Sequence, residues 1–366
     1  MLWTNFWLKL EYRFDRASGT RFPATAAPSN RSRYNHYLAK ILVTGGAGYI
    51  GSHTVHLLLK RGHDCIVVDN LSKGYRHNVL AGRLREIPLS DTEALYQLMR
   101  AEQFDAVIHF AAFIAVGEST QIPETYFINN VSGSLSLLDA MIRADLKKIV
   151  FSSTAAVYGT PAKMPITEDM PHQAESPYGD SKVMVEKLLQ WFDQYRGMRS
   201  VCLRYFNACG AEPDAGLGEE HIPETHLIPL VLRAAAGEKP VTIFGTDYPT
   251  KDGSNIRDYI HVIDLGEAHL AAVQYLLDGG ASDQFNVGTG DGYSVLEVIQ
   301  AVETVTGLTV PYTVGARRAG DPVSLVADST KLRARLGWQP TRSDLSDVVR
   351  DAWRFEPIRH SRAAGK

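Results

Sequence analysis

The 366-residue sequence lacks the features that mark several classes of protein. No apolar run approaches the ~20 residues that a membrane-spanning helix needs. Charge of one sign is not in excess, because 38 Lys and Arg residues stand against 41 Asp and Glu residues. Internal repeats and low-complexity tracts are missing from residue 40 onward. We therefore expect an ordinary globular protein that has neither nucleic acid nor a membrane as a partner.

Cysteine is scarce, and its three positions limit the chemistry that it can support. Cys65, Cys202 and Cys209 have no metal-ligand spacing, and any disulfide scheme leaves one of them unpaired. The simplest interpretation is a reducing compartment, which we take to be the cytoplasm. We expect the three side chains to serve in packing and expect no metal site.

Residues 1–38 differ in composition from the rest of the chain. Aromatic residues such as Trp3 and Trp7 are mixed with charged residues such as Glu11 and Asp15. The segment lacks the uninterrupted apolar stretch of a secretory signal, and its acidic residues argue against a transit peptide. We expect a poorly ordered N-terminal extension and assign it no function.

From residue 40 onward, short apolar runs rich in β-branched residues alternate with segments of helical periodicity. This alternation is typical of an α/β fold, in which helices cover both faces of a parallel sheet. The expected strands are residues 40–44, 65–69, 106–109, 148–152 and 200–205, and the expected helices are residues 49–61, 91–101, 126–144 and 177–195. After residue 207 the regularity falls, which indicates a smaller second lobe.

The first expected strand leads directly into a glycine-rich run that opens the first expected helix. Gly45, Gly48 and Gly51 are three residues apart, which allows a tight turn, a close approach of backbone to pyrophosphate and close packing of helix on strand. Asp69 ends the second strand, where its carboxylate can accept hydrogen bonds from the adenosine ribose and repel a 2′-phosphate. The sequence therefore predicts a Rossmann doubly wound sheet that binds NAD rather than NADP.

These motifs also suggest domain boundaries. We expect an NAD-binding Rossmann domain in residues 39–206 and a smaller, mixed α/β substrate lobe in residues 207–357. Some strands and helices of the second segment are expected to return to the first domain, and residues 358–366 are expected to form a tail.

A candidate general base lies on the last helix of the predicted Rossmann domain. Tyr178 and Lys182 are one helical turn apart and project from one face. An isolated tyrosine has a pKa of about 10, so we expect the Lys182 ammonium and the charge of oxidised nicotinamide to lower the pKa of the phenol. Thr154 ends the preceding strand, and its hydroxyl can hydrogen-bond the reacting oxygen. The three residues indicate redox chemistry on an alcohol.

Seven blocks of the sequence together resemble one enzyme family. The blocks at residues 45–51, 69–71, 109–112, 116–119, 176–179, 204–207 and 257–262 are similar to those of the UDP-glucose 4-epimerases, within the extended short-chain dehydrogenase/reductases. The resemblance covers about residues 40–353. It implies an isomerase that interconverts UDP-glucose and UDP-galactose with tightly held NAD, through a transient 4-keto sugar. It also implies a homodimer, formed through helices near residues 126–144 and 177–195.

The resemblance further implies roles for individual residues. Tyr178 would be the base, Lys182 would bind the nicotinamide ribose, and Thr154 would contact the sugar O4. The residues implied to bind NAD are Gly45, Gly48, Tyr49, Ile50, Gly51, Asp69, Asn70, Leu71, Ser72, Phe110, Ala111, Ala112, Asn129, Tyr178, Lys182 and Phe206. The residues implied to face the nucleotide sugar are Thr154, Tyr178, Asn207, His226, Leu227, Phe244, Arg257, Arg318, Asp321 and Leu325.

Three departures from the family pattern bear on specificity. Ile114 stands where the epimerases often carry a lysine, and residues 88–91 lack the usual Gly-Asp-Ile that contacts adenine. Leu325 stands where a family tyrosine, cysteine or glycine controls the room for an N-acetyl group. Because a branched leucine fills that space, the sequence favours sugars without an N-acetyl group, although UDP-N-acetylhexosamines and UDP-pentoses stay open as alternative substrates.

Two alternatives to the epimerase interpretation can be weighed. Nucleotide-sugar dehydratases and decarboxylases place an acidic residue just after the equivalent of Thr154, whereas this chain has Ala155 and Ala156. Alanine has no proton to give, so elimination and decarboxylation are disfavoured. A catalytically inactive NAD-binding regulatory protein is disfavoured by the intact set of Thr154, Tyr178 and Lys182.

Overall fold

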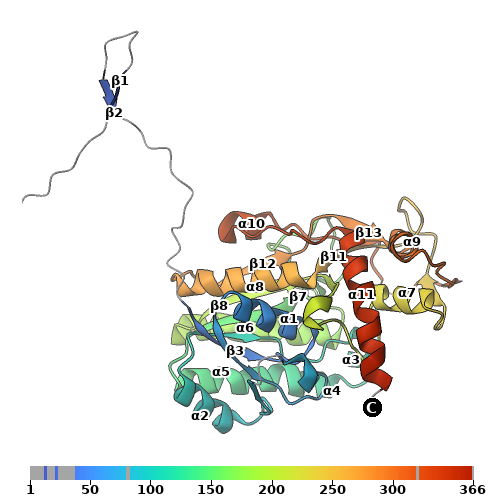
Figure 1. Ribbon diagram of the computed structural model, residues 1–366. Coiled ribbons are helices and arrows are strands. Elements are labelled where there is room, and N and C mark those ends of the chain that lie inside the picture. Colours follow the sequence, from blue (N-terminus) through green and yellow to red (C-terminus); the bar gives the residue numbers. More distant parts are fainter. Residues whose placement is uncertain (1–11, 15–20, 24–37, 80–82, 319–320, 365–366) are drawn as a thin grey trace, which may run out of the picture. The chain divides into compact units, whose positions relative to one another are not determined.

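The computed structural model describes residues 12–14, 21–23, 38–79, 83–318 and 321–364 (Figure 1). Contacts divide the chain into a unit that ends at Tyr37 and a compact unit of residues Leu38–Lys366. Within the first unit, the short strands β1 (Tyr12–Phe14) and β2 (Arg21–Pro23) pair antiparallel. The remainder of the expected extension at residues 1–38 lies almost wholly outside the described residues.

A seven-stranded parallel sheet forms the centre of the second unit, in the order β12-β8-β7-β6-β3-β4-β5. Its strands are β3 (Lys40–Thr44), β4 (Asp64–Val68), β5 (Leu84–Arg85), β6 (Ala106–His109), β7 (Lys148–Thr154), β8 (Arg199–Tyr205) and β12 (Asp283–Val287). The predicted fold class is confirmed, and five of the strands match the expected runs. β12 comes from the segment expected to form the second lobe, so the two parts of the chain share one sheet.

Alternate residues of the central strands enter two different cores. In β3, Ile41 and Val43 pack toward α1 (Tyr49–Lys60) and α8 (Val262–Leu277), whereas Leu42 packs toward the opposite layer. That opposite layer consists of α2 (Thr92–Glu102), α5 (Gly133–Arg143) and α6 (Pro177–Arg196). Figure 1 shows α8 above the sheet and α2 and α5 below it. Because side chains alternate along a strand, an almost continuous apolar run is what a sheet covered on both faces requires.

The expected helix at residues 126–144 is interrupted. The structure has α4 (Pro123–Tyr126), a π-helical segment η2 (Phe127–Ser132) and then α5. The buried Asn130 side chain lies in the π-helical turns, where it donates to the carbonyl of Phe113 at 3.0 Å and to Ser181 Oγ at 3.0 Å. The helical periodicity of apolar residues in the sequence does not predict this local change from α-helical to π-helical turns.

The remaining described elements lie outside the seven-stranded sheet and the helices named above. They are η1 (Arg76–Asn78), α3 (Val116–Ser119), η3 (Ala155–Tyr158), β9 (Asn207–Cys209), η4 (Pro213–Ala215), α7 (Leu227–Ala235), β10 (Val241–Phe244), β11 (Ile256–His261), β13 (Gly292–Ser294), α9 (Val295–Thr306), β14 (Tyr312–Gly315), β15 (Ser324–Leu325), α10 (Thr330–Leu336) and α11 (Leu345–Ala364). A third core joins α7, α9, α11, β10 and β11. Helix α11 continues through most of the expected tail at residues 358–366.

Cysteine burial and surface charge agree with the composition. Cys65, Cys202 and Cys209 are free and buried in the three cores, so their predicted packing role is confirmed.

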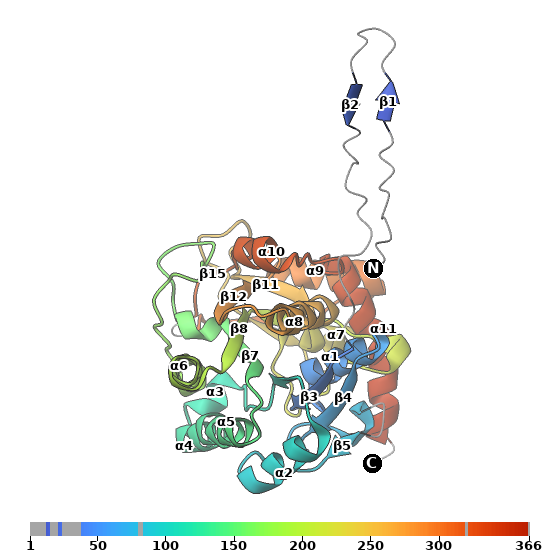
Figure 2. The same cartoon turned by 90° about the vertical axis from the view of Figure 1, so that its left-hand side faces the viewer.

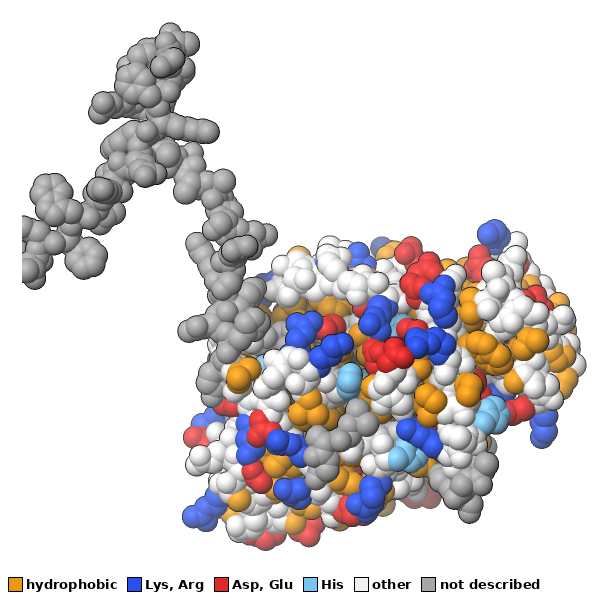
Figure 3. All heavy atoms as spheres, viewed as in Figure 1, with side chains coloured by type: hydrophobic (Ala, Val, Ile, Leu, Met, Phe, Trp, Pro, Cys, Tyr) orange, Lys and Arg blue, Asp and Glu red, His pale blue; other side chains and the backbone are white. Residues whose placement is uncertain are grey.

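On the face in Figure 3, Lys and Arg side chains are interspersed with Asp and Glu side chains. No helix in the described part of the chain is long and apolar enough to cross a membrane.

Asp264, in the first turn of α8, ties that helix to the segment before α11. Its buried carboxylate accepts the backbone N–H groups of Thr341 at 2.9 Å and Arg342 at 2.8 Å, and the hydroxyl of Ser343 at 2.8 Å. Each of these bonds joins residues more than seventy positions apart in sequence. The carboxylate therefore holds part of the second lobe against the Rossmann sheet.

We expect Asp264→Asn to lower the free energy of unfolding by about 2–4 kcal/mol, because an amide removes the charge and one acceptor from a buried set of donors. Urea denaturation followed by far-UV circular dichroism measures the change. Asp278→Asn, on the exposed residue that follows α8, is the matched control and should change stability by less than about 0.5 kcal/mol. Equal effects of the two substitutions would contradict the role of Asp264.

Candidate active site

The glycine-rich loop between β3 and α1 has a geometry that only glycine permits. Gly45 has φ of +74°, and a Cβ atom there would lie 2.5 Å from the backbone nitrogen of Ala111. A Cβ atom at Gly51 would lie 2.3 Å from the carbonyl oxygen of Gly45. Gly48 is the N-cap of α1, so the free N–H groups of the first helical turn, including those of Tyr49 and Ile50, begin here. The loop fits the pyrophosphate of a dinucleotide.

Asp69 follows β4 and braces this loop. Its carboxylate accepts the N–H groups of Ala47 at 3.0 Å and Leu71 at 2.8 Å, and burial raises its pKa. Each carboxylate oxygen can still accept another hydrogen bond, as an adenosine ribose would require. Asn70 Oδ1 accepts both the N–H and the hydroxyl of Ser72, so the predicted residues 69–72 form one turn at the end of the strand.

The other predicted cofactor residues lie at neighbouring strand ends. Phe110, Ala111 and Ala112 follow β6, and the Phe110 ring packs 4.6 Å from the ring of His269. Phe206 follows β8 and packs against the small core of Val157, Tyr158 and Ile166. Leu325, predicted to face the sugar, packs against the same core. One apolar cluster therefore connects a predicted cofactor residue with a predicted substrate residue.

Asn129 and its neighbour have different surroundings. The Asn129 amide donates to Asn130 Oδ1 at 2.9 Å, and Asn130 also accepts the N–H of Phe113 at 2.8 Å. Asn130 thus connects the loop after β6 with Ser181 on α6. The sequence analysis missed Asn130, because a polar residue within an expected helix gives no signal that its side chain is buried.

Thr154, Tyr178 and Lys182 are brought together by β7 and α6. Ser176 caps α6 by accepting the N–H of Gly179 at 3.1 Å, and the helix then carries Tyr178 and Lys182 on its buried face. Tyr178 is 8% exposed and Lys182 is 2% exposed. Thr154 ends β7, and its hydroxyl is hydrogen-bonded to the phenol of Tyr178.

Burial dominates the electrostatics of Tyr178 and Lys182. Burial raises the pKa of Tyr178 above its ordinary value, and only the hydrogen bond from Thr154 opposes that rise. The Lys182 Nζ atom lies 6.0 Å from the centroid of the Tyr178 ring and donates to the carbonyl of Ser152 at 2.8 Å. Burial lowers the pKa of Lys182 to about 7. Lowering of the phenol pKa by Lys182 together with oxidised nicotinamide stays a prediction, since burial raises this pKa in the chain by itself.

A buried ion pair one turn beyond Lys182 positions α6. Arg204 of β8 donates from Nη2 to Glu186 Oε2 at 2.6 Å and from Nε to Glu186 Oε1 at 2.9 Å. Ser153 of β7 donates to Glu186 Oε1 at 2.6 Å. The sequence analysis missed Glu186, although its spacing of four residues from Lys182 places it on the same face of the helix.

Predicted substrate residues lie on the paired strands β9, β11 and β15. Asn207 donates to the carbonyl of Asp258 at 2.9 Å, and the Arg257 guanidinium pairs with Asp321. Arg257 lies opposite Leu325 in the register of β11 and β15. Asp321 is held in turn by Asn255, which donates to it at 3.0 Å. These residues all follow residue 206 in the sequence.

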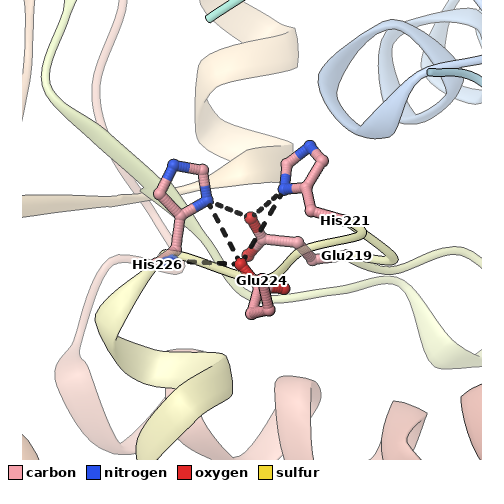
Figure 4. A group of neighbouring side chains, drawn as sticks. All are labelled: Glu219, His221, Glu224 and His226. Atoms are coloured by element: carbon pink, nitrogen blue, oxygen red, sulfur yellow. Dashed lines mark hydrogen bonds and ion pairs between the residues drawn. The ribbon is translucent and has the colours of Figure 1, made fainter. Parts of the chain in front are cut away.

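The other predicted substrate residues form two further groups. The guanidinium carbon of Arg318 lies 3.8 Å from the centroid of the Phe244 ring, which is a close stacking contact. His226 is the N-cap residue of α7, which begins at Leu227. The His226 ring contacts Glu219, which lies beside His221 and Glu224 (Figure 4). This cluster was not predicted from the sequence, although Glu and His alternate in residues 219–226.

Comparisons with known proteins agree with this geometry. Residues 41–288 match the model of the NAD dependent epimerase/dehydratase family. The chain is 49% identical over 318 residues to the UDP-glucose 4-epimerase of Lactobacillus helveticus, covering 86% of this chain and 96% of that protein.

Solved structures give the same result. A UDP-glucose 4-epimerase from Brucella ovis in complex with NAD has a TM-score of 0.85 and 45% identity, covering 86% of this chain and 97% of that one. A UDP-glucose-4-epimerase from Stenotrophomonas maltophila with bound NAD and formylated UDP-arabinopyranose has a TM-score of 0.85 and 40% identity, covering 90% of this chain and 100% of that one. The chain therefore belongs to the NAD dependent epimerase/dehydratase family and, within it, to the UDP-glucose 4-epimerases.

Proposed function

We propose that this protein is an NAD-dependent isomerase that interconverts UDP-glucose and UDP-galactose through a transient 4-keto sugar. The observation that carries the proposal is the hydrogen-bonded pair of Thr154 and Tyr178, with Lys182 on the next helical turn, at the carboxyl end of β7. Ligands of doubly wound sheets bind at that edge of the sheet. Residues 39–206 would hold NAD, and residues 207–357 would supply most of the UDP-sugar contacts.

In the proposed reaction, the Tyr178 oxygen takes the proton of the sugar 4-hydroxyl and later returns it. Thr154 holds the reacting oxygen through its hydroxyl, which already shares a hydrogen bond with Tyr178. NAD, when bound, supplies a hydride acceptor and a positive charge. A positive charge near the phenol is needed, since burial alone raises the pKa of Tyr178.

Lys182 serves as an anchor in this proposal. One of its three ammonium hydrogens is used by the carbonyl of Ser152 at 2.8 Å, so two remain for the ribose hydroxyls of a dinucleotide. Because burial lowers the pKa of Lys182 to about 7, a hydrogen-bond acceptor near its nitrogen is enough to favour the charged ammonium form at neutral pH. Lys182 therefore orients the cofactor more than it tunes the phenol.

The second lobe offers guanidinium groups for the nucleotide diphosphate. Arg257 is oriented by Asp321 and Arg318 is stacked on Phe244, and both arrangements reduce the freedom that the side chains would lose on binding. Arginine suits this role because its planar group can grip two phosphate oxygens at once. Asn207, His226 and Leu227 are the other proposed substrate contacts.

A 4-epimerase of other UDP-sugars is the alternative that a specific observation favours. The relative from Stenotrophomonas maltophila binds formylated UDP-arabinopyranose, a pentose derivative. Leu325 argues for small substituents on the sugar, since it packs in an apolar cluster with Phe206. An inactive regulatory protein is less favoured, because the hydrogen-bonded Thr154 and Tyr178 are both present.

We also propose a homodimer in the cytoplasm. Exposed apolar residues follow one face of α6, at Met184, Trp191 and Tyr195, and a second stripe at Ile128 and Leu135. The rings of Trp191 and Tyr195 are stacked 5.7 Å apart. Figure 2 shows α5 and α6 on the same side of the sheet, so the two stripes can form one apolar surface.

The unpaired, buried cysteines support a reducing compartment.

Tyr178→Phe should retain NAD but lower kcat by about 10²–10⁴-fold, because it removes the proton acceptor and keeps the ring. Conversion of UDP-galactose, measured chromatographically, gives the rate, and the absorbance of protein-bound nucleotide gives the cofactor content. Tyr312→Phe, on the exposed strand β14, is the control and should keep full activity. Full turnover by the Tyr178 variant would reject the assigned base.

The protein should epimerise UDP-galactose faster than UDP-N-acetylgalactosamine, because Leu325 fills the space near the sugar. Leu325→Gly should raise the rate with UDP-N-acetylgalactosamine relative to UDP-galactose by about 10-fold or more. Ser324→Gly is the matched control, since neighbouring strand residues face opposite sides. A panel that includes UDP-xylose, without added NAD, tests the pentose alternative. An unchanged ratio in the Leu325 variant would show that this residue does not control the pocket.

Sedimentation at micromolar concentration should give a dimer for the native protein. Introducing charge into the stripe by Met184→Glu together with Trp191→Glu should give a monomer, because two carboxylates would be buried without partners. Val314→Glu, at an exposed apolar residue on β14, should leave the dimer intact. A native protein that sediments only as a monomer would refute the proposed interface.

A further inference from the structure

The loop before α7 gathers four side chains that can bind a metal. Glu219, His221, Glu224 and His226 each direct one ligand atom into a common space, and these atoms all lie within 4.8 Å of one another. Figure 4 shows the two imidazoles on either side of the two carboxylates. All four come from one short segment of eight residues, so the backbone itself holds them together.

The distances suit a small cation after slight adjustment. His221 Nδ1 lies 2.9 Å from Glu219 Oε1, and His226 Nδ1 contacts the same oxygen. Glu224 Oε1 lies 4.0 Å from His221 Nδ1 and 3.9 Å from His226 Nδ1. Zinc–ligand bonds of 2.0–2.2 Å in a tetrahedron separate the ligand atoms by roughly 3.4 Å. Reaching that geometry would require the contact between His226 Nδ1 and Glu219 Oε1 to open by about 1 Å and the other three contacts to change by about half an ångström.

Burial and charge also favour a cation. The side chains of Glu219 and Glu224 are only 6% and 1% exposed, so two carboxylates are held close together away from water. Arg233 pairs with Glu224 Oε2 at 3.2 Å, whereas Glu224 Oε1 accepts the N–H groups of Thr225 and His226 and is the oxygen nearer the imidazoles. A divalent ion would offset the charge of the two carboxylates, and the Arg233 guanidinium paired with Glu224 would leave one positive charge on the whole group.

We propose that Glu219, His221, Glu224 and His226 bind one divalent transition-metal ion, with Zn²⁺ as the best match. Mixed imidazole and carboxylate ligands suit zinc better than magnesium or calcium, which prefer oxygen ligands alone. The ion fixes residues 219–226 ahead of α7 and takes no part in proton or hydride transfer. The His226 Nε2 atom, on the far side of the ring, stays free to contact other groups.

The position of the site explains what such an ion would stabilise. The His221 ring lies edge-on to the ring of Tyr49, with centroids 6.2 Å apart, and Tyr49 donates to the carbonyl of Gly210 at 2.7 Å. Tyr49 is the first residue of α1, directly after the glycine-rich loop. Fixing the loop by a metal would therefore support the contact between the second lobe and the start of α1.

The competing explanation is a network of hydrogen bonds without metal. Both imidazoles could donate from Nδ1 to Glu219, while Glu224 Oε1 accepts the N–H groups of Thr225 at 2.8 Å and His226 at 3.0 Å. The two explanations differ in one measurable property, which is the stoichiometry of tightly bound metal. That measurement requires no turnover, so its outcome is independent of the proposed epimerase activity.

The test uses the untagged full-length protein, stripped with EDTA, loaded with Zn²⁺ and dialysed extensively. Elemental analysis should find about one zinc ion per chain. The double variant His221→Ala and His226→Ala should bind at least 10-fold less, and Glu224→Gln, which keeps the side-chain shape, should also weaken binding. His360→Ala, which removes an exposed imidazole elsewhere, should bind as the native protein does.

Thermal unfolding supplies a second measurement. Zn²⁺ at about 100 times its dissociation constant should raise the Tm of the native protein by roughly 5 °C, and Mg²⁺ at the same concentration should not. Native protein that retains no zinc after dialysis would overturn the proposal and leave the hydrogen-bond network. Equal zinc content in the native protein and the double variant would overturn it as well, because the ion would then be bound elsewhere.

Discussion

The buried ion pair between Arg204 and Glu186 is the interaction on which the candidate active site depends. It joins the middle of α6 to β8, and Ser153 of β7 completes the set of hydrogen bonds to Glu186. Breaking such a pair leaves an unpaired buried charge, which typically costs 3–5 kcal/mol. Because α6 is fixed in this way, Tyr178 and Lys182 keep their positions at the carboxyl end of β7. The pair is therefore a constraint on orientation rather than a source of net stability.

The same burial that orders these side chains also sets their proton affinities. Desolvation disfavours the charged form of any buried group, so the pKa of Tyr178 rises and the pKa of Lys182 falls to about 7. Neither residue is thus prepared for proton transfer by the protein alone. A base that becomes active only when a cationic cofactor is bound would couple the chemistry to the presence of that cofactor, which is useful in a reaction that returns the hydride to the substrate.

More than one kind of contact connects the segments before and after residue 207. Strand β12 adds to the Rossmann sheet beside β8, and α8, which packs on that sheet, is tied by the carboxylate of Asp264 to the segment before α11. Phe206 and Leu325, one from each predicted lobe, share an apolar cluster. These contacts make residues Leu38–Lys366 one compact unit, although the sequence suggests a boundary near residue 207. The candidate active site is therefore built on a frame in which the segments before and after residue 207 pack as one unit.

The sequence by itself determined the features that depend on local patterns. Alternating periodicity specified five strands and their helices, the glycine spacing specified the cofactor loop, and the four-residue interval specified that Tyr178 and Lys182 share a helix face. Tertiary structure alone decided what depends on burial and on contacts between distant residues. It decided the direction in which the pKa of Tyr178 shifts, the pairing of Glu186 with Arg204, and which strand of the later segment joins the sheet, namely β12 beside β8. Desolvation and long-range packing act between segments that no local pattern brings together, which is the physical reason for this division.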